Sequence, residues 1–160
     1  MPFFYQEKKW SCGPAAMRIA LVTLGINRTE KQLIKLLKTN SRIGTNNKAF
    51  PEVAEKFKLN YIVKRVATTN DLIGAFNREY IIIICYTEEK MKVGHYAVIK
   101  EINDKYIILK DPTHGSNLKF SLNRFSKLWK QTFENEKRWF IGIKLNRDAK
   151  ERINNKTYKK

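Results

Sequence analysis

The pattern of apolar residues changes at Tyr61, and this change constrains the fold more than any other feature of the chain. Before Tyr61 the apolar residues recur with helical spacing, whereas after it they form short runs that are typical of strands. Helices followed by a mostly antiparallel sheet predict an α+β fold. A length of 160 residues favours one domain with a sizeable core.

The predicted elements follow from this pattern and from local start and stop signals. Proline suits the first turn of a helix, so Cys12-Gly13-Pro14 predicts a helix start, and Gly25 predicts its end. A polar loop is expected at 41–47. Helices are predicted at Pro14–Leu24, Lys48–Lys58, Thr69–Arg78 and Leu122–Trp129, and one more helix is predicted to begin after a cap at Asn27 or Thr29. Strands are predicted at Tyr61–Val66, Tyr80–Tyr86, His95–Ile102, Tyr106–Lys110 and Trp139–Leu145.

Cys12 is the candidate nucleophile because it lies at the start of the first predicted helix. The dipole and the unbonded N–H groups of a helix N-terminus favour a thiolate over a thiol. An isolated cysteine is more often a small buried hydrophobe. We give that inert role to Cys85, which follows four isoleucines in a predicted strand.

Three other residues supply the groups that a cysteine nucleophile needs. His95 is a candidate base, Asp111 is a carboxylate that can orient it, and Gln6 is a candidate oxyanion donor. Each has an ordinary alternative as a core histidine, a turn cap before Pro112, or a surface glutamine. His114 is the alternative base, although its turn favours surface exposure.

The strands that carry His95 and Asp111 are joined at Asn103-Asp104. With three loop residues, position 95 lies directly opposite position 111, at about 4.5–5.5 Å between Cβ atoms. A two-residue loop would place the two side chains on opposite faces. The pair therefore requires an odd loop or a β-bulge.

Metal chemistry is disfavoured by the spacing of the candidate ligands. The cysteine, histidine and aspartate side chains lack short pairs such as Cys-x-x-Cys or His-x-x-x-His. We expect no metal, and thiol chemistry needs no cofactor.

Three motifs together resemble the C39 peptidase family, which has a papain-like fold. They are Gln, five residues, then Cys-Gly-Pro-Ala; Gly-His-Tyr-Ala-Val on a strand; and Asp-Pro, two residues, then Gly. The resemblance implies cleavage of leader peptides that end in two glycines, often by a domain of an ABC transporter. Since this chain has no membrane segment or nucleotide-binding motif, an export transporter would act in trans. The implied roles are nucleophile for Cys12, base for His95, orienting carboxylate for Asp111 and oxyanion donor for Gln6.

Two other functions stay open. A papain-like enzyme can transfer a peptidyl or aminoacyl group to an amine instead of water. A relative lacking the cysteine can grip a peptide in its cleft without cutting it, but the intact Cys12, His95 and Asp111 argue against that function.

The formal net charge of +17 is spread along the chain, with a further concentration in a basic tail. We expect a peptidase domain at 1–145 and a flexible tail at 146–160. The simplest explanation is a lysine-rich proteome and a solvated tail. Attraction to an anionic membrane surface or to nucleic acid is the alternative, although no nucleic-acid motif supports it.

A cytoplasmic location is expected from three observations. The N-terminus does not have the pattern of a signal peptide, and no apolar run is long enough to span a bilayer. The two cysteines need no disulfide. The oligomeric state is left open.

Overall fold

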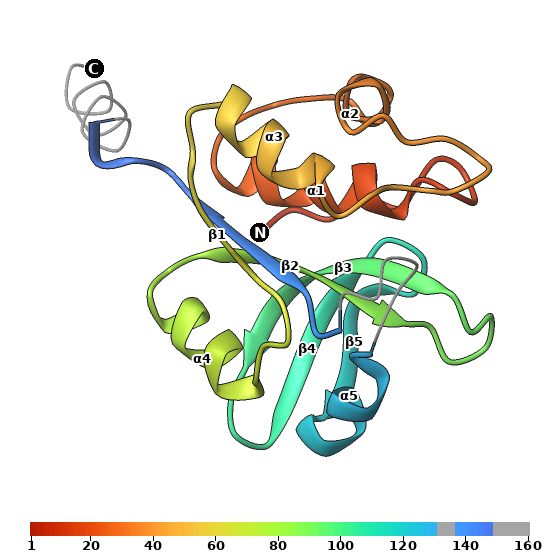
Figure 1. The fold of residues 1–160 in the computed structure, drawn as a ribbon, viewed down its shortest axis with the longest axis vertical. Helices are drawn as coiled ribbons and strands as arrows, with labels where there is room; N and C mark the ends of the chain where they lie inside the picture. Colours follow the sequence, from red (N-terminus) through yellow and green to blue (C-terminus); the bar gives the residue numbers. More distant parts are fainter. Residues whose placement is uncertain (131–136, 149–160) are drawn as a thin grey trace.

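The computed structural model describes residues 1–130 and 137–148 and shows an antiparallel sheet between two helical layers (Figure 1). Among these residues the sheet has six strands in the order β1-β6-β2-β3-β4-β5. This confirms the α+β class, with helices early and the sheet later. The elements are α1 (Cys12–Thr23), α2 (Glu30–Leu36), α3 (Ala49–Lys56), β1 (Asn60–Lys64), α4 (Thr69–Asn77), β2 (Ile81–Thr87), β3 (Gly94–Ile102), β4 (Tyr106–Asp111), β5 (Gly115–Ser121), α5 (Leu122–Leu128) and β6 (Phe140–Lys144).

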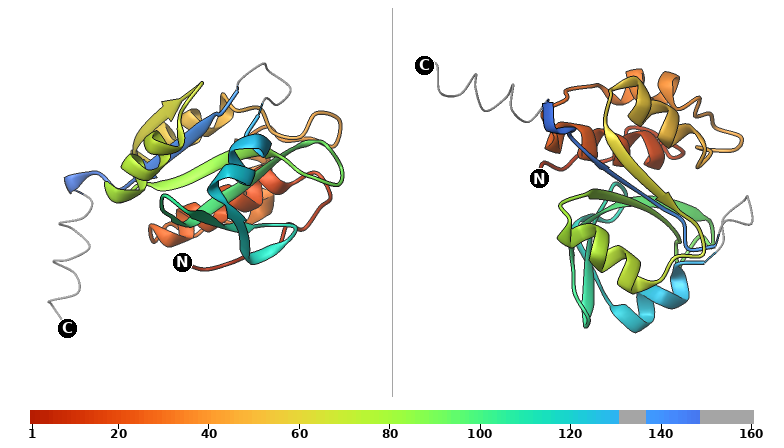
Figure 2. Two further views of the ribbon diagram at one scale, coloured as in Figure 1. Left: turned by 90° about the horizontal axis from the view of Figure 1, so that it is seen from below. Right: turned by 60° about the vertical axis from the view of Figure 1, so that its left-hand side comes forward.

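Both faces of the central strand β2 are buried, which explains its continuous apolar run. Ile83 and Cys85 belong to a core shared with α1, α2 and α3, whereas Ile82 and Ile84 belong to a second core shared with α4 and α5. Figures 1 and 2 show α1 and α3 on one side of the central strands and α4 and α5 on the other. Alternate side chains of a strand point to opposite faces, so a strand between two helical layers must be apolar throughout.

Capping boxes fix the starts of two helices. Thr29 and Gln32 form a capping box at α2, so Thr29 is the cap of the two that were predicted. Thr68 and Asp71 form another at α4, one residue before the predicted start. Gly25 follows α1 with φ of 81°, as a C-terminal glycine should.

Strand β5 has no counterpart in the sequence prediction. It pairs with β4 at the edge of the sheet, where Ile108 lies opposite Lys119. Leu118 and Phe120 are its two apolar residues, and its other side chains are polar or glycine. An edge strand with a solvated face carries too weak an apolar pattern to be recognised alone.

Two predicted elements end earlier than expected because the backbone turns into the left-handed region. Strand β1 stops before Val66, which has φ of 50°, a strained conformation for a β-branched residue. Helix α3 stops before Lys58, which has φ of 54°.

The described residues contain no helix that is long and apolar enough to cross a membrane. Asn146, the first residue of the predicted tail, donates a hydrogen bond from its side chain to the Lys58 carbonyl at 3.1 Å. Residues 149–160 of the tail lie outside the described residues.

Candidate active site

His95 and Asp111 lie on neighbouring strands, but they are not directly opposite each other. Val98 of β3 pairs with Lys110 of β4, and continuing this register places Ala97 opposite Asp111. His95 is therefore the diagonal neighbour of Asp111 on the same face. The direct pairing expected for a three-residue loop is therefore not what the structure has.

The turn between these strands explains the difference. The Asn103 N–H donates to the Tyr106 carbonyl at 3.0 Å, so the loop between them has two residues instead of three. A β-bulge between Ile99 and Glu101 then shifts the register by one residue. The bulge, which was the alternative to an odd loop, is what brings both side chains to one face.

The structure brings three of the predicted site residues together. His95 Nε2 lies 2.8 Å from Asp111 Oδ1, and the two side chains are 4% and 0% exposed. Cys12 is the first residue of α1, is partly buried, and lies beside the ring of His95 on the same cavity, close enough to raise the pKa of that ring. The imidazole therefore lies between a carboxylate and a thiol.

The electrostatics of this cluster favour a protonated imidazole. Burial lowers the pKa of His95, but hydrogen bonds to Asp111 and Cys12 and the charges of both groups raise it to about 10. Burial opposes the charged form of Asp111, yet hydrogen bonds to His95 and Tyr86 hold the pKa of this carboxyl below its usual value.

The carboxylate of Asp111 also caps the turn that follows it. Besides His95, Oδ1 accepts hydrogen bonds from the N–H groups of Thr113 and His114, at 2.8 and 2.9 Å. The ordinary role as a turn cap and the contact with His95 are thus compatible, and the turn fixes the carboxylate from behind.

His114 faces a different partner. Its Nε2 lies 3.2 Å from Glu88 Oε1, and its side chain is 30% exposed. The other oxygen of Glu88 accepts the N–H groups of Lys90 and Met91, at 2.9 and 2.6 Å. His114 therefore contacts the loop between β2 and β3, and His95 is the histidine next to Cys12.

Gln6 lies before α1, and its side chain is held by three hydrogen bonds. Its Oε1 accepts from the Thr113 hydroxyl at 2.7 Å, and its Nε2 donates to the carbonyls of Lys8 and Lys9 at 2.8 and 3.1 Å. Both amide hydrogens have partners in the chain itself. An oxyanion role requires substrate to redirect one of them.

A cavity of about 480 Å³ opens beside Cys12 and His95. One wall is the loop 41–47 with the residues before α1, and the other is formed by the β2–β3 loop and the start of β3. The loop packs so closely on α1 that a Cβ atom at Gly13 would lie 2.3 Å from Thr45 Oγ1. Cys85 is 2% exposed, as expected for a core residue, although it also lines this cavity.

The Peptidase C39 family model matches residues 1–133. This chain belongs to the C39 peptidase family. An uncharacterized protein of Methanothermobacter thermautotrophicus is 30% identical over 110 residues, which cover 69% of this chain and 70% of the relative. An uncharacterized protein of Methanothermobacter marburgensis is 27% identical over 124 residues, or 78% and 80% of the two chains.

Solved structures of C39 peptidase domains share the fold. The peptidase domain of Streptococcus ComA, a bifunctional ABC transporter of a quorum-sensing pathway, has a TM-score of 0.70 at 22% identity, covering 89% of this chain and 97% of that domain. A double glycine motif protease from an AMS/PCAT transporter, in complex with its leader peptide, has a TM-score of 0.69 at 20% identity, covering 91% of each chain.

Tyr86 is a residue of this C39 site that sequence reasoning placed only in a strand. Its hydroxyl donates to Asp111 Oδ2 at 2.6 Å, and its ring lies edge-on to His95 with the centroids 5.7 Å apart. Burial and the nearby Asp111 raise the pKa of Tyr86, so the hydroxyl keeps its proton and donates. Tyr86 directly opposes His95 across β2 and β3, and that register was the signal that could have identified it.

Glu30 is a second residue that was missed. Its buried carboxylate accepts the Glu7 N–H at 2.9 Å and the Ser11 hydroxyl, and Ser11 is the residue that precedes α1. The first turn of α2 thus clamps the segment between Gln6 and Cys12. In the sequence, an acidic residue at a helix start looks like an ordinary dipole partner.

The part of the chain that the structure describes has no group of side chains suited to bind a metal ion. Within residues 1–130 and 137–148, no three His, Cys, Asp or Glu side chains are grouped so that they could hold an ion.

Proposed function

We propose that this chain is a cysteine peptidase with Cys12 as nucleophile, His95 as base and Asp111 as the orienting carboxylate. The observation that carries the proposal is the position of His95, with Nε2 at 2.8 Å from Asp111 Oδ1 and the ring beside Cys12 on the same cavity. This arrangement leaves one ring nitrogen to exchange a proton at the thiol. The cavity beside Cys12 gives a peptide access to it.

The reaction proceeds through a thioester. The Cys12 thiolate attacks the scissile carbonyl, and the His95 imidazolium gives its proton to the leaving amine as the C–N bond breaks. His95 then takes a proton from the water that hydrolyses the thioester. Asp111, held by Tyr86 and by its own turn, keeps the ring in one tautomer and orientation.

The developing oxyanion needs hydrogen-bond donors near Cys12. The Cys12 N–H is one of the N–H groups at the helix start that have no partner within the helix. The Gln6 amide is the second proposed donor. One of its bonds to Lys8 and Lys9 is then exchanged for a bond to substrate.

The proposed substrate is a precursor with a leader that ends in two glycines. Support comes from the family and from the described neighbours, one a double glycine motif protease crystallised with a leader peptide and the other a domain of an ABC transporter. An export transporter acting in trans is the proposed partner.

The test is cleavage of a panel of leader-type peptides, followed by mass spectrometry. Wild type should cut, whereas Cys12→Ala should lose turnover and keep most of its peptide affinity. If wild type cuts nothing but joins peptides to added amines, the function is acyl transfer. If wild type and Cys12→Ala bind equally and neither reacts, the chain is a peptide-binding module.

A further inference from the structure

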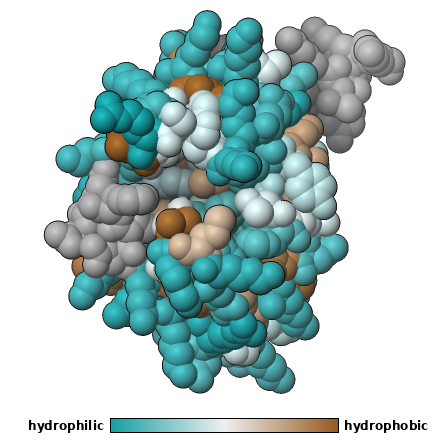
Figure 3. Space-filling view, turned by 90° about the vertical axis from the view of Figure 1, so that its right-hand side faces the viewer, coloured by the Kyte–Doolittle hydropathy of each residue, from teal (hydrophilic) through white to brown (hydrophobic). Residues whose placement is uncertain are grey.

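Thr113 connects the wall of the cavity to the side chain of Gln6. It lines the cavity together with Cys12 and His95, on the face where Figure 3 shows a hollow. Its hydroxyl donates to Gln6 Oε1 at 2.7 Å, although the two residues are 107 positions apart in the sequence. A long-range hydrogen bond therefore fixes the oxygen end of the Gln6 amide.

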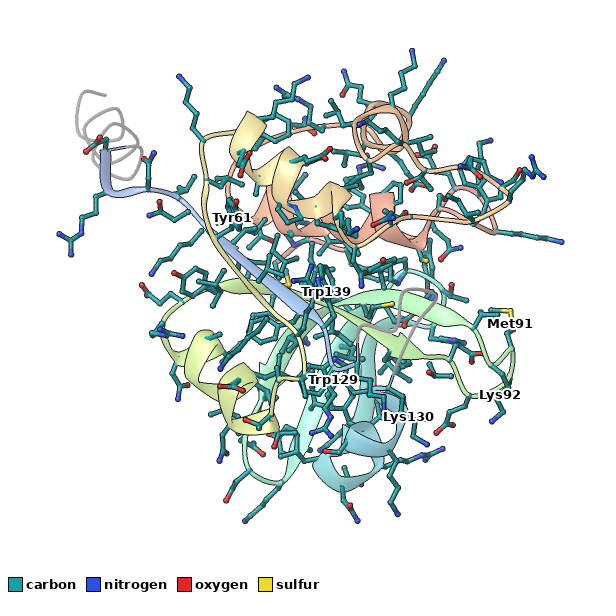
Figure 4. All side chains as sticks on the ribbon, viewed as in Figure 1. Tyr61, Met91, Lys92, Trp129, Lys130 and Trp139 are labelled. Carbon is teal, nitrogen blue, oxygen red and sulfur yellow. The ribbon has the colours of Figure 1, made fainter. Side chains whose placement is uncertain are left out.

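The turn that carries Thr113 is itself held in place. The Asp111 carboxylate accepts the N–H groups of Thr113 and His114, at 2.8 and 2.9 Å. His114 in turn lies 3.2 Å from Glu88 in the β2–β3 loop, and Figure 4 shows Met91 at the tip of this loop. The hydroxyl of Thr113 is thus attached to a backbone that is anchored on both sides.

The direction of the Thr113 bond decides which end of the amide faces the substrate. Because the hydroxyl donates to the oxygen, the nitrogen end points the other way, where Nε2 donates to the carbonyls of Lys8 and Lys9. An oxyanion needs N–H donors. Hydrogen bonds in a chain polarise one another, so a bond to the amide oxygen also makes the N–H groups stronger donors.

We propose that Thr113 is a positioning residue for the oxyanion site, and that its hydroxyl holds the Gln6 amide with the N–H groups available to the substrate oxygen. The inference rests on the proposed function and adds a residue to it. Thr113 is exposed in the free chain. A peptide in the cavity excludes water from the hydroxyl, and a hydrogen bond is stronger away from water. The contribution therefore appears in kcat.

Thr113→Val separates this role from a role in the turn. The bond from position 113 to Asp111 comes from the backbone N–H, and so does the bond from Gln6 to the Pro112 carbonyl at 3.0 Å. The substitution keeps both of these bonds and the shape of the side chain. It removes only the hydroxyl.

The experiment is a double-mutant cycle on cleavage of a leader-type peptide that contains two glycines. Thr113→Val should lower kcat by about three- to tenfold with KM unchanged, and Thr113→Ser should restore it. In the Gln6→Ala background, Thr113→Val should cause no further loss, because the group it positions is gone. Thr23→Val is the matched control. It removes a hydroxyl that donates to the Ile19 carbonyl at 2.7 Å near the other end of α1, and it should leave kcat unchanged.

The pH–rate profile gives a further readout. Thr113→Val changes no ionisable group, so the midpoints of the profile should stay at their wild-type values. A shifted profile would show that the turn has moved Asp111, and would overturn a role through Gln6.

Nuclear magnetic resonance tests the bond without any turnover. In chain labelled with ¹⁵N-glutamine, the side-chain amide signals of Gln6 are assigned by their loss in Gln6→Ala. Thr113→Val should shift them toward the values of free glutamine, and Thr113→Ser should keep them near the wild-type values.

The outcomes separate the inference from the function on which it rests. If wild type cleaves and Thr113→Val has full kcat, or if its loss multiplies with that of Gln6→Ala, the inference alone fails. Equal losses in Thr113→Val and Thr113→Ser, or unchanged Gln6 signals in Thr113→Val, also overturn it. Signals that shift in Thr113→Val and return in Thr113→Ser, in a chain that cleaves nothing, support the hold on the amide and contradict the peptidase.

Discussion

The sheet side and the helix side of the site hold their functional groups in opposite ways. On the sheet side, His95 and Asp111 are 4% and 0% exposed and are hydrogen-bonded to each other, and Asp111 also accepts a hydrogen bond from Tyr86. On the helix side, Cys12 and Gln6 are only partly buried, and Gln6 is bonded mainly to nearby carbonyls of its own segment.

This difference separates two tasks. A buried, fully bonded pair excludes water and holds the proton carrier in one orientation. A partly exposed nucleophile is accessible to a substrate. An amide whose hydrogen bonds can be exchanged can bind that substrate in place of its own segment. The sheet side should therefore tolerate little change, and the helix side should show its defects in catalysis rather than in folding.

The largest effect is expected from removing the base on the sheet side. His95→Ala should lower kcat by at least about 10⁴ and abolish fast alkylation of Cys12 by iodoacetamide. Cys85 should label slowly throughout, because it is 2% exposed. His114→Ala is the control, and a greater loss in that variant than in His95→Ala would move the base role to His114.

The second-largest effect on kcat is expected on the helix side, from removing the Gln6 amide. Gln6→Ala should lower kcat by about 10²–10³ if its amide stabilises the oxyanion, with little change in thermal stability. Two of its three side-chain hydrogen bonds are local and all three are exposed, so their loss should not unfold the chain. An unchanged kcat would show that the amide never leaves Lys8 and Lys9.

A smaller effect is expected from removing the Tyr86 hydroxyl, which donates to Asp111 of the His95–Asp111 pair. Tyr86→Phe removes one donor from Asp111 and keeps the ring that packs on His95. We expect about a tenfold loss in kcat, unchanged KM, and a shift of the pH–rate profile, since a charge-assisted bond contributes about 1.5–3 kcal/mol. A loss of stability without any change in the profile would make Tyr86 merely structural.

The ion pair of His95 and Asp111 predicts how the free energy of unfolding depends on pH. Burial opposes the charge, but Asp111 and Cys12 raise the pKa of His95 from 6.5 to about 10. A folded-state pKa above the unfolded value contributes stability below about pH 6.5, and this contribution is lost as the pH rises through about 10. The free energy of unfolding in urea should therefore fall more steeply over this range in wild type than in His95→Gln. Equal slopes would contradict the imidazolium–carboxylate pair.

The sequence predicted the parts of the molecule that depend on local signals. Cys12-Gly13-Pro14 marked a helix start, and the structure begins α1 at Cys12 itself. The apolar periods placed the early helices and most of the strands. Such signals act over a few residues and need no knowledge of packing.

The parts it missed depend on long-range pairing. The position of His95 relative to Asp111 depends on one bulge, and the contact of Tyr86 with both depends on the β2–β3 register. Glu30 reaches the segment before Cys12 only because α2 packs on α1. None of these contacts leaves a periodic trace in the sequence.

The smallest effect is expected from removing the basic tail. Ending the chain after Asn146 should leave kcat/KM on a short peptide nearly unchanged, because the proposed catalytic groups all lie upstream and the Asn146 bond to Lys58 is kept. Binding to anionic liposomes or nucleic acid, if the tail mediates it, should weaken on truncation and fade as salt is raised, since screening acts over about 8 Å at physiological ionic strength. We expect full-length chain to bind neither surface even at low salt. A tail-dependent, salt-sensitive interaction would instead show that the tail is a docking segment separate from the site.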